Sequence, residues 1–212
     1  MNKNLVIRLL IVAAMFGTAI YLWWKLPDEL PIHWNFEWQA DNWWAKWINL
    51  LLIPLVVLAI TILMPLVSKI DPKKKNYESF SKTWELIQYA IVISLAYFYY
   101  ISIYATINET ADISMLMMLG FWVLFIFIGN YMWKVKQNYF VWIKFPWTLE
   151  NEEVWNKTHR FWWKMFMLWW LIFIINAFLQ WQVVWVFLFV IILILVVPII
   201  YSYNTYNKIT NK

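Results

Sequence analysis

The chain has 212 residues, of which 64% are hydrophobic and 14% charged, and its formal net charge is +5. A soluble domain of this length cannot bury so much apolar surface, so the composition predicts an integral membrane protein. The lack of cysteine excludes disulfides, thiolate metal sites and cysteine catalysis, and the scatter of basic residues between apolar stretches argues against nucleic-acid binding.

Six apolar windows are each long enough to cross a bilayer of about 30 Å at 1.5 Å per residue. They predict an all-α, polytopic membrane protein with six transmembrane helices, at Leu5–Trp24, Trp47–Val67, Leu86–Ile107, Ile113–Trp133, Phe161–Leu179 and Val183–Tyr203. The first window is interpreted as an uncleaved helix and not as a signal peptide, because Lys25–Asp28 follows it without a small-residue cleavage site.

The basic residues predict the orientation of these helices. All lysines and arginines except Lys25 and Lys46 lie at the two termini or around the second and fourth loops. By the positive-inside rule, both termini and these two loops are cytoplasmic. The predicted organisation is an N-terminal two-helix unit (residues 1–68), a basic cytoplasmic linker (69–85) and a four-helix unit (86–212). Short turns at 108–112 and 180–182 predict two antiparallel helix hairpins.

The predicted outer loop, residues 25–46, is rich in prolines and carboxylates. Pro27 and Pro31 favour an extended or turn path and reject a helix. The loop is either a solvated connector or a recognition surface for something outside the cell. A cationic peptide would suit such a surface, because four acidic residues lie in the loop: Asp28, Glu29, Glu37 and Asp41. His33 has no second histidine at ligand spacing, so neither a metal site nor a cofactor is predicted.

The predicted inner loop, residues 138–160, contains the start of a helix. Pro146 ends the extended stretch, and Thr148 is predicted to cap a helix that carries Glu150 and Glu152 in its first turn. This short amphipathic helix lies at the cytoplasmic interface and runs into the fifth transmembrane helix. It is either an elbow that orients that helix or a docking surface for a cytoplasmic partner.

The apolar windows contain few residues that could catalyse a reaction or bind an ion. No Asp or Glu lies well inside any of them, whereas proton- or cation-coupled transporters usually need such carboxylates. There is no nucleotide-binding glycine loop, no HExxH pair and no credible Ser/His/Asp set, so the chain is predicted not to be an enzyme. A small-solute or lipid-handling transporter and a structural membrane protein without a ligand remain as alternative functions.

Two stretches resemble a known family. The segments Gly129–Tyr131, Asn138–Phe140, Pro146–Leu149 and Glu152–Arg160 resemble the signature of the SdpI family, and Leu26–Asn35 resembles the small domain of unknown function that commonly precedes it. The resemblance implies a multi-pass protein of the bacterial cell membrane that senses or neutralises a secreted, membrane-active peptide toxin. It also implies that such a protein holds a cytoplasmic helix-turn-helix repressor at the membrane.

The resemblance also implies candidate binding residues. On the toxin side they are Pro27, Asp28, Pro31, His33, Trp34 and Asn35. On the repressor side they are Asn138, Tyr139, Pro146, Trp147, Thr148, Glu152, Glu153, Trp155, Thr158, His159 and Arg160. The expected partners are therefore the lipid bilayer, a peptide toxin and a repressor, with no direct contact to nucleic acid.

The tryptophan and glycine contents are inverted. The chain has 19 tryptophans and three glycines, whereas average glycine usage gives about 15 in this length. A membrane aromatic belt explains tryptophans at helix ends. It does not explain those inside apolar windows, which are Trp122, Trp169, Trp170 and Trp185.

Many of these tryptophans stand where the SdpI family typically has glycine. Such positions are Trp142, Trp162 and Trp163, and glycine is also common in the family near Trp44, Trp122 and Trp133. Trp162 and Trp169 are seven residues apart, as are Trp163 and Trp170, so both doublets share one helix face. The chain is either a tryptophan-rich variant or one whose UGA codons the source cell reads as glycine. Trp34, Trp147 and Trp155 match family tryptophans and are expected to be genuine.

Overall fold

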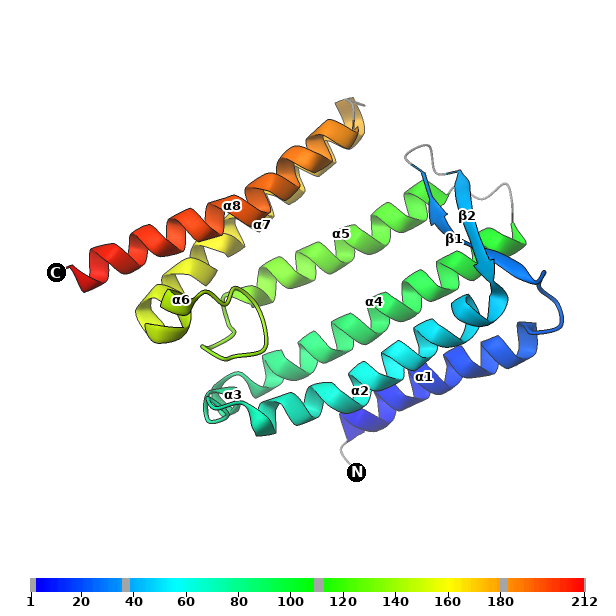
Figure 1. Cartoon of the computed structure of the whole chain (residues 1–212), viewed down its shortest axis with the longest axis horizontal. Coiled ribbons are helices and arrows are strands. Elements are labelled where there is room, and N and C mark those ends of the chain that lie inside the picture. The colour runs from blue at the N-terminus through cyan, green and yellow to red at the C-terminus, as the bar shows by residue number, and fades with distance from the viewer. Residues whose placement is uncertain (1–2, 36–38, 109–112, 180–182, 212) are drawn as a thin grey trace. The chain divides into compact units, whose positions relative to one another are not determined.

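The computed structural model describes residues 3–35, 39–108, 113–179 and 183–211 (Figure 1). Its elements, in chain order, are α1 (Lys3–Leu22), β1 (Glu29–Trp34), β2 (Ala40–Ala45), the π-helical turn η1 (Ile48–Leu52), α2 (Ile53–Ile70), α3 (Asn76–Ser79), α4 (Ser81–Ile107), α5 (Ile113–Met132), α6 (Pro146–Glu150), α7 (Glu152–Leu179) and α8 (Val183–Thr210). The core of each predicted short turn, residues 109–112 and 180–182, lies outside the described residues.

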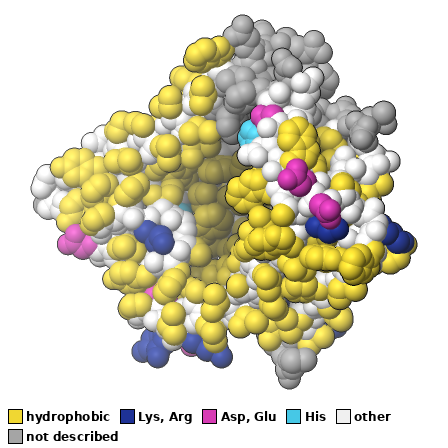
Figure 2. All heavy atoms as spheres, turned by 45° about the vertical axis from the view of Figure 1, so that its right-hand side comes forward, with side chains coloured by type: hydrophobic (Ala, Val, Ile, Leu, Met, Phe, Trp, Pro, Cys, Tyr) yellow, Lys and Arg dark blue, Asp and Glu magenta, His cyan; other side chains and the backbone are white. Residues whose placement is uncertain are grey.

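Five of the described helices are long and apolar enough to cross a membrane. They are Lys3–Leu22, Ile48–Ile70, Ser81–Ile107, Met115–Met132 and Leu188–Thr210. Large hydrophobic side chains on these helices are exposed, and hydrophobic side chains predominate on the face shown in Figure 2. The chain is therefore a mostly helical, multi-pass membrane protein. The sixth predicted span, residues 161–179, falls within α7 and stays a prediction, as does the orientation.

The chain forms two compact units. The first contains residues Met1–Leu66 and Glu85–Leu124, and the second contains Val67–Trp84 and Phe125–Lys212. The units predicted along the sequence, 1–68, 69–85 and 86–212, stay a prediction.

The first unit is built on three helices that lie side by side, α1, α2 and α4 (Figure 1). Met15, Val57 and Tyr99 are fully buried between them, and the Tyr99 hydroxyl donates to the Met15 carbonyl at 3.2 Å. The first half of α5 belongs to the same unit. A Cβ on Gly120 would lie 2.5 Å from the Tyr97 ring, so any larger residue at this point of α5 would require that ring to move.

The strands β1 and β2 pair antiparallel as a β-hairpin, so the all-α prediction is wrong for these residues. Leu30 pairs with Trp44 and Pro31 with Trp43, and the register shifts between Pro31 and Trp34. The extended path predicted from the prolines is confirmed. The pairing is not apparent in the sequence, because β2 lacks alternation of apolar and polar residues and its strand is exposed almost throughout.

The second unit contains the packed pair α7 and α8 together with α6. Its predicted single amphipathic helix is two elements, and the prediction that Thr148 caps it is wrong. Pro146 starts α6, because proline tolerates the first turn of a helix, and Thr148 lies inside it. Asn151 is extended and caps α7: its Oδ1 accepts from the backbone N–H of Glu153 at 2.8 Å and of Val154 at 3.1 Å.

Candidate functional site

Two surfaces hold the predicted site residues. One is the hairpin, residues 26–46, in the first unit; the other is the elbow, residues 134–160, in the second unit.

The hairpin is fixed to the helices of its unit through its buried side. Leu30 is fully buried in the core that α1, α2 and α4 share. The Pro31 carbonyl accepts from Asn49 Nδ2 at 3.2 Å, and Asn49 Oδ1 accepts from the Ser102 hydroxyl at 3.2 Å. Because Asn49 and Ser102 are buried, breaking these bonds would leave polar groups unpaired, and the hairpin is held in one position.

The outer side of the hairpin carries a His–Asp contact and a Lys–Asp ion pair. His33 Nδ1 lies 2.6 Å from Asp41 Oδ1, and Lys46 Nζ lies 2.9 Å from Asp28 Oδ1. The Asp28 side chain is 95% exposed, so its ion pair contributes little to stability. Of the predicted toxin-side residues, Pro27, Asp28 and His33 are exposed, Trp34 and Asn35 are half-buried, and Pro31 is buried.

A cleft of about 430 Å³ opens between the hairpin and the end of α4. Trp34 and Trp43 of the two strands line it, together with Glu29 and with Thr106 and Asn108 at the end of α4. A volume of this order accommodates a small ligand or a few side chains. The lining suits apolar or aromatic groups accompanied by one cation.

The elbow is organised around the Asp71 carboxylate, which is 1% exposed. Its Oδ1 accepts from the backbone N–H of Lys73 at 2.7 Å. Its Oδ2 accepts from the Tyr77 hydroxyl at 3.0 Å and from the backbone N–H of Tyr139 at 2.9 Å. Burial, followed by the hydrogen bond to Asp71, raises the pKa of Tyr77. Sequence reasoning missed Asp71, because it is one of several acidic residues in the basic linker and nothing in the sequence distinguishes it from Glu78.

Gln137 joins the same loop to the turn before α7. Its Nε2 donates to the carbonyls of Thr148 at 2.7 Å and Leu149 at 2.9 Å. Lys73 Nζ donates to Gln137 Oε1 and to the Leu149 carbonyl, and Asn76 Nδ2 donates to the Gln137 carbonyl at 2.7 Å. Residues 71–77 are therefore part of the elbow's hydrogen-bond network.

Two predicted repressor-side residues point inward and shape the elbow's backbone. Asn138 is fully buried, and its Oδ1 accepts from the N–H groups of Phe140 at 3.0 Å and Val141 at 2.8 Å. Thr148 is also fully buried, and its hydroxyl accepts from the Phe145 N–H at 2.9 Å. Both side chains form hydrogen bonds with backbone N–H groups, and because they are buried, a partner protein cannot contact them.

Trp155 and His159 form the buried centre of the elbow. The Trp155 indole N–H donates to the Val135 carbonyl at 2.9 Å. His159 Nδ1 donates to the Trp155 carbonyl at 2.8 Å, while Nε2 accepts from the Ile143 N–H at 3.3 Å. The two rings stack with centroids 4.1 Å apart. Burial lowers the pKa of His159 to about 4, so the imidazole is neutral at physiological pH.

Only part of the predicted repressor-side set is accessible. Tyr139, Pro146, Glu152, Glu153 and Arg160 are exposed. Trp147 is half-buried and donates to Ser202 Oγ at 2.8 Å; Asn138, Thr148, Trp155, Thr158 and His159 are buried. A groove of about 610 Å³ runs beside the accessible set, lined by Glu153, Lys157, Tyr201, Thr205, Lys208 and Ile209. A docking partner would contact this accessible set.

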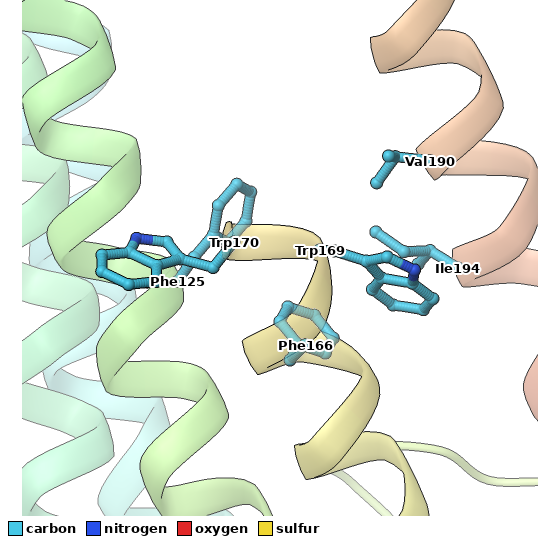
Figure 3. Close-up of a pocket in the computed structure, with 6 residues that line it drawn as sticks. All are labelled: Phe125, Phe166, Trp169, Trp170, Val190 and Ile194. Atoms are coloured by element: carbon cyan, nitrogen blue, oxygen red, sulfur yellow. The ribbon is translucent and has the colours of Figure 1, made fainter. Parts of the chain in front are cut away.

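The second unit also has a cavity of about 20 Å³, lined by Phe125, Phe166, Trp169, Trp170, Val190 and Ile194 (Figure 3). It is far smaller than a ligand pocket of some 300–1,000 Å³ and is not a candidate site. Within the described residues, no group of three or more His, Cys, Asp or Glu could hold a metal ion.

Comparisons with known proteins place these surfaces in context. Residues 134–202 match the SdpI/YfhL protein family, and residues 10–58 match the domain of unknown function DUF1648. The chain is similar to the immunity protein SdpI of Bacillus subtilis (strain 168), with 26% identity over 217 residues that cover all of both chains. No solved structure matches. Both resemblances predicted from the sequence are confirmed.

Proposed function

We propose that the chain is a membrane immunity protein of the SdpI family, which protects its cell against a membrane-active peptide toxin. The observation that supports this most directly is the similarity to an immunity protein along the whole chain. The aligned range contains both the hairpin and the elbow. The family is not one of enzymes, and catalysis is not part of the proposal.

The proposed orientation places both termini and the elbow in the cytoplasm and the hairpin outside. It is supported by the lysines and arginines around the second and fourth loops. In this orientation the hairpin is the first part of the protein that a secreted peptide would meet.

The hairpin cleft is the proposed recognition site for the peptide. Trp34 and Trp43 would contact apolar side chains, and the exposed Glu29 would attract a lysine or arginine. A peptide that attacks membranes carries both kinds of group, since it must bind anionic headgroups and then insert apolar surface. The fixed position of the hairpin favours binding, because little conformational freedom is lost.

Survival of toxin-challenged cells tests this function. The chain is expressed in a Bacillus subtilis strain that lacks its own SdpI, and the cells are exposed to medium from the intact strain. A second arm uses synthetic peptides encoded beside the gene of this chain. A gain in survival of roughly tenfold or more over empty vector in either arm is the expected result. If the protein inserts normally into the membrane but survival does not increase in either arm, the proposal is contradicted.

The exposed part of the elbow is the proposed contact for a cytoplasmic helix-turn-helix repressor. Tyr139, Glu152, Glu153 and Arg160 are exposed, and Glu153 lines the groove together with Lys157. Charged and aromatic groups of this kind suit a reversible protein contact. Co-purification of the repressor encoded beside the gene tests this contact, with Glu152→Ala expected to weaken it and the exposed Glu78→Ala, placed on α3, as the control.

A further inference from the structure

Trp142 has a backbone conformation that suits glycine. It lies in the loop between α5 and α6 with φ +71°, and it is the one non-glycine residue with positive φ in the described part of the chain. A side chain with a Cβ is strained in this left-handed region, and a bulky aromatic residue is a clear outlier there. Glycine adopts the same conformation without strain.

Three indoles in the second unit contrast with two others. Among the described residues, no acceptor meets the buried indole N–H groups of Trp142, Trp162 and Trp170. The indole N–H groups of Trp147 and Trp155 donate to Ser202 Oγ at 2.8 Å and to the Val135 carbonyl at 2.9 Å. Buried tryptophans normally find such a partner, because an unpaired N–H loses its hydration without compensation. The first three residues therefore lack a feature that the other two have.

The packing of α7 adds a third observation. Trp162 is 1% exposed and Trp169 is 4% exposed, and their rings meet at 4.7 Å between centroids. Figure 3 shows Trp169 pointing toward Ile194 of α8, whereas Trp170 points toward Phe125. Adjacent bulky rings thus occupy both sides of α7. Membrane helices more often place small residues where they pack closely.

We propose that Trp142, Trp162 and Trp170 stand at positions where the source cell inserts glycine, their codons being UGA read as glycine. The same codon is read as tryptophan under another code, so one reassignment produces both the surplus of tryptophan and the shortage of glycine. The chain has 19 tryptophans and three glycines, which is the expected direction of this exchange. Trp147 and Trp155 are genuine tryptophans with UGG codons.

The replacement of glycine by tryptophan also explains the aromatic lining of the cavity in Figure 3. Trp170 is one of its six lining residues, and glycine there would replace an indole that has no hydrogen-bond partner among the described residues. The aromatic lining is therefore not a ligand site. With glycine at residue 170, the backbone of α7 would be free to approach its neighbours here.

Two measurements test the proposal. The first reads residues 142, 162 and 170 in the gene and, by mass spectrometry, in peptides of the full chain isolated from its source cell. UGA codons and glycine-containing peptides are expected at all three positions, with UGG and tryptophan at 147 and 155. UGG codons or tryptophan in the native peptides at 142, 162 and 170 would overturn the proposal.

The second measurement compares the melting temperatures of full-length variants in detergent. Trp142→Gly should melt above Trp142→Ala by at least about 3 °C, because alanine removes the indole but retains the strained Cβ. Trp155→Gly is the control and should melt well below the starting chain, since it leaves a cavity and an unpaired carbonyl. Equal melting of Trp142→Gly and Trp142→Ala would overturn the assignment at this position.

Discussion

The hairpin and the elbow use polar side chains in opposite ways. In the hairpin, the ion pairs His33–Asp41 and Lys46–Asp28 lie on the surface, and the anchoring is done by Leu30 and the Pro31 carbonyl underneath. In the elbow, Asp71, Asn138 and His159 are buried and form hydrogen bonds with neighbouring side-chain and backbone groups. The hairpin can therefore change its surface chemistry at little cost in stability, whereas changes in the elbow disturb folding before they reach a partner.

Trp155→Ala should cause the largest loss in stability. The indole is fully buried and donates to the Val135 carbonyl, so its removal leaves a cavity and an unpaired acceptor. We expect a cost of about 3–5 kcal/mol. Denaturant unfolding in detergent measures it. Tyr139→Ala, at an exposed elbow position, is the control and should change stability by no more than about 0.5 kcal/mol.

Acidification should destabilise the elbow through His159. Its folded-state pKa of about 4 lies below the unfolded value near 6.5, so the folded protein prefers the neutral ring. This contribution is fully present above pH 6.5 and is lost as the pH falls toward 4, at about 1.4 kcal/mol per pH unit. The difference in unfolding free energy between the starting chain and His159→Gln is measured from pH 7 to pH 4. A difference that does not change with pH would show that His159 is accessible to water in the folded protein.

Asp71→Asn should weaken the elbow more than Asp28→Asn weakens the hairpin. The buried Asp71 carboxylate accepts three hydrogen bonds, and bonds to a charged group contribute about 1.5–3 kcal/mol. Asp28 is 95% exposed, and its ion pair contributes at most about 1 kcal/mol. Thermal melting of the two variants side by side measures both. Equal losses would remove the contrast between the two surfaces.

His33→Ala should have the smallest effect on stability. The side chains of His33 and Asp41 are 64% and 43% exposed, so their contact is screened by water and contributes less than about 1 kcal/mol. An unchanged melting temperature is expected. A loss of more than about 2 kcal/mol would show that the hairpin is held by its surface pairs instead of its buried side.

The sequence predicted the membrane class and the positions of most helices, because long apolar windows have few alternative structures. It did not predict the hairpin, since Trp43 and Trp44 of β2 face solvent and the pairing depends on contacts that Leu30 and Asn49 make with distant helices.

The candidate site was predicted by resemblance, which identifies residues without their burial. His159 and Asn138 belong to the matched motif, yet both are buried and pair with backbone groups. Asp71 and Gln137 organise the same surface and were missed, because nothing local in the sequence relates residue 71 to residue 139. Such pairings become visible only when the chain is folded.

Toxin survival of hairpin variants tests the central claim most directly. Glu29→Gln and Trp34→Ala, at the cleft, are compared with Glu78→Gln, an exposed control on α3, in cells that contain equal amounts of inserted protein. Each cleft variant is expected to lower survival by roughly tenfold, because each removes a group that would contact the peptide, while the control retains full protection. Full protection by both cleft variants would contradict recognition by the hairpin.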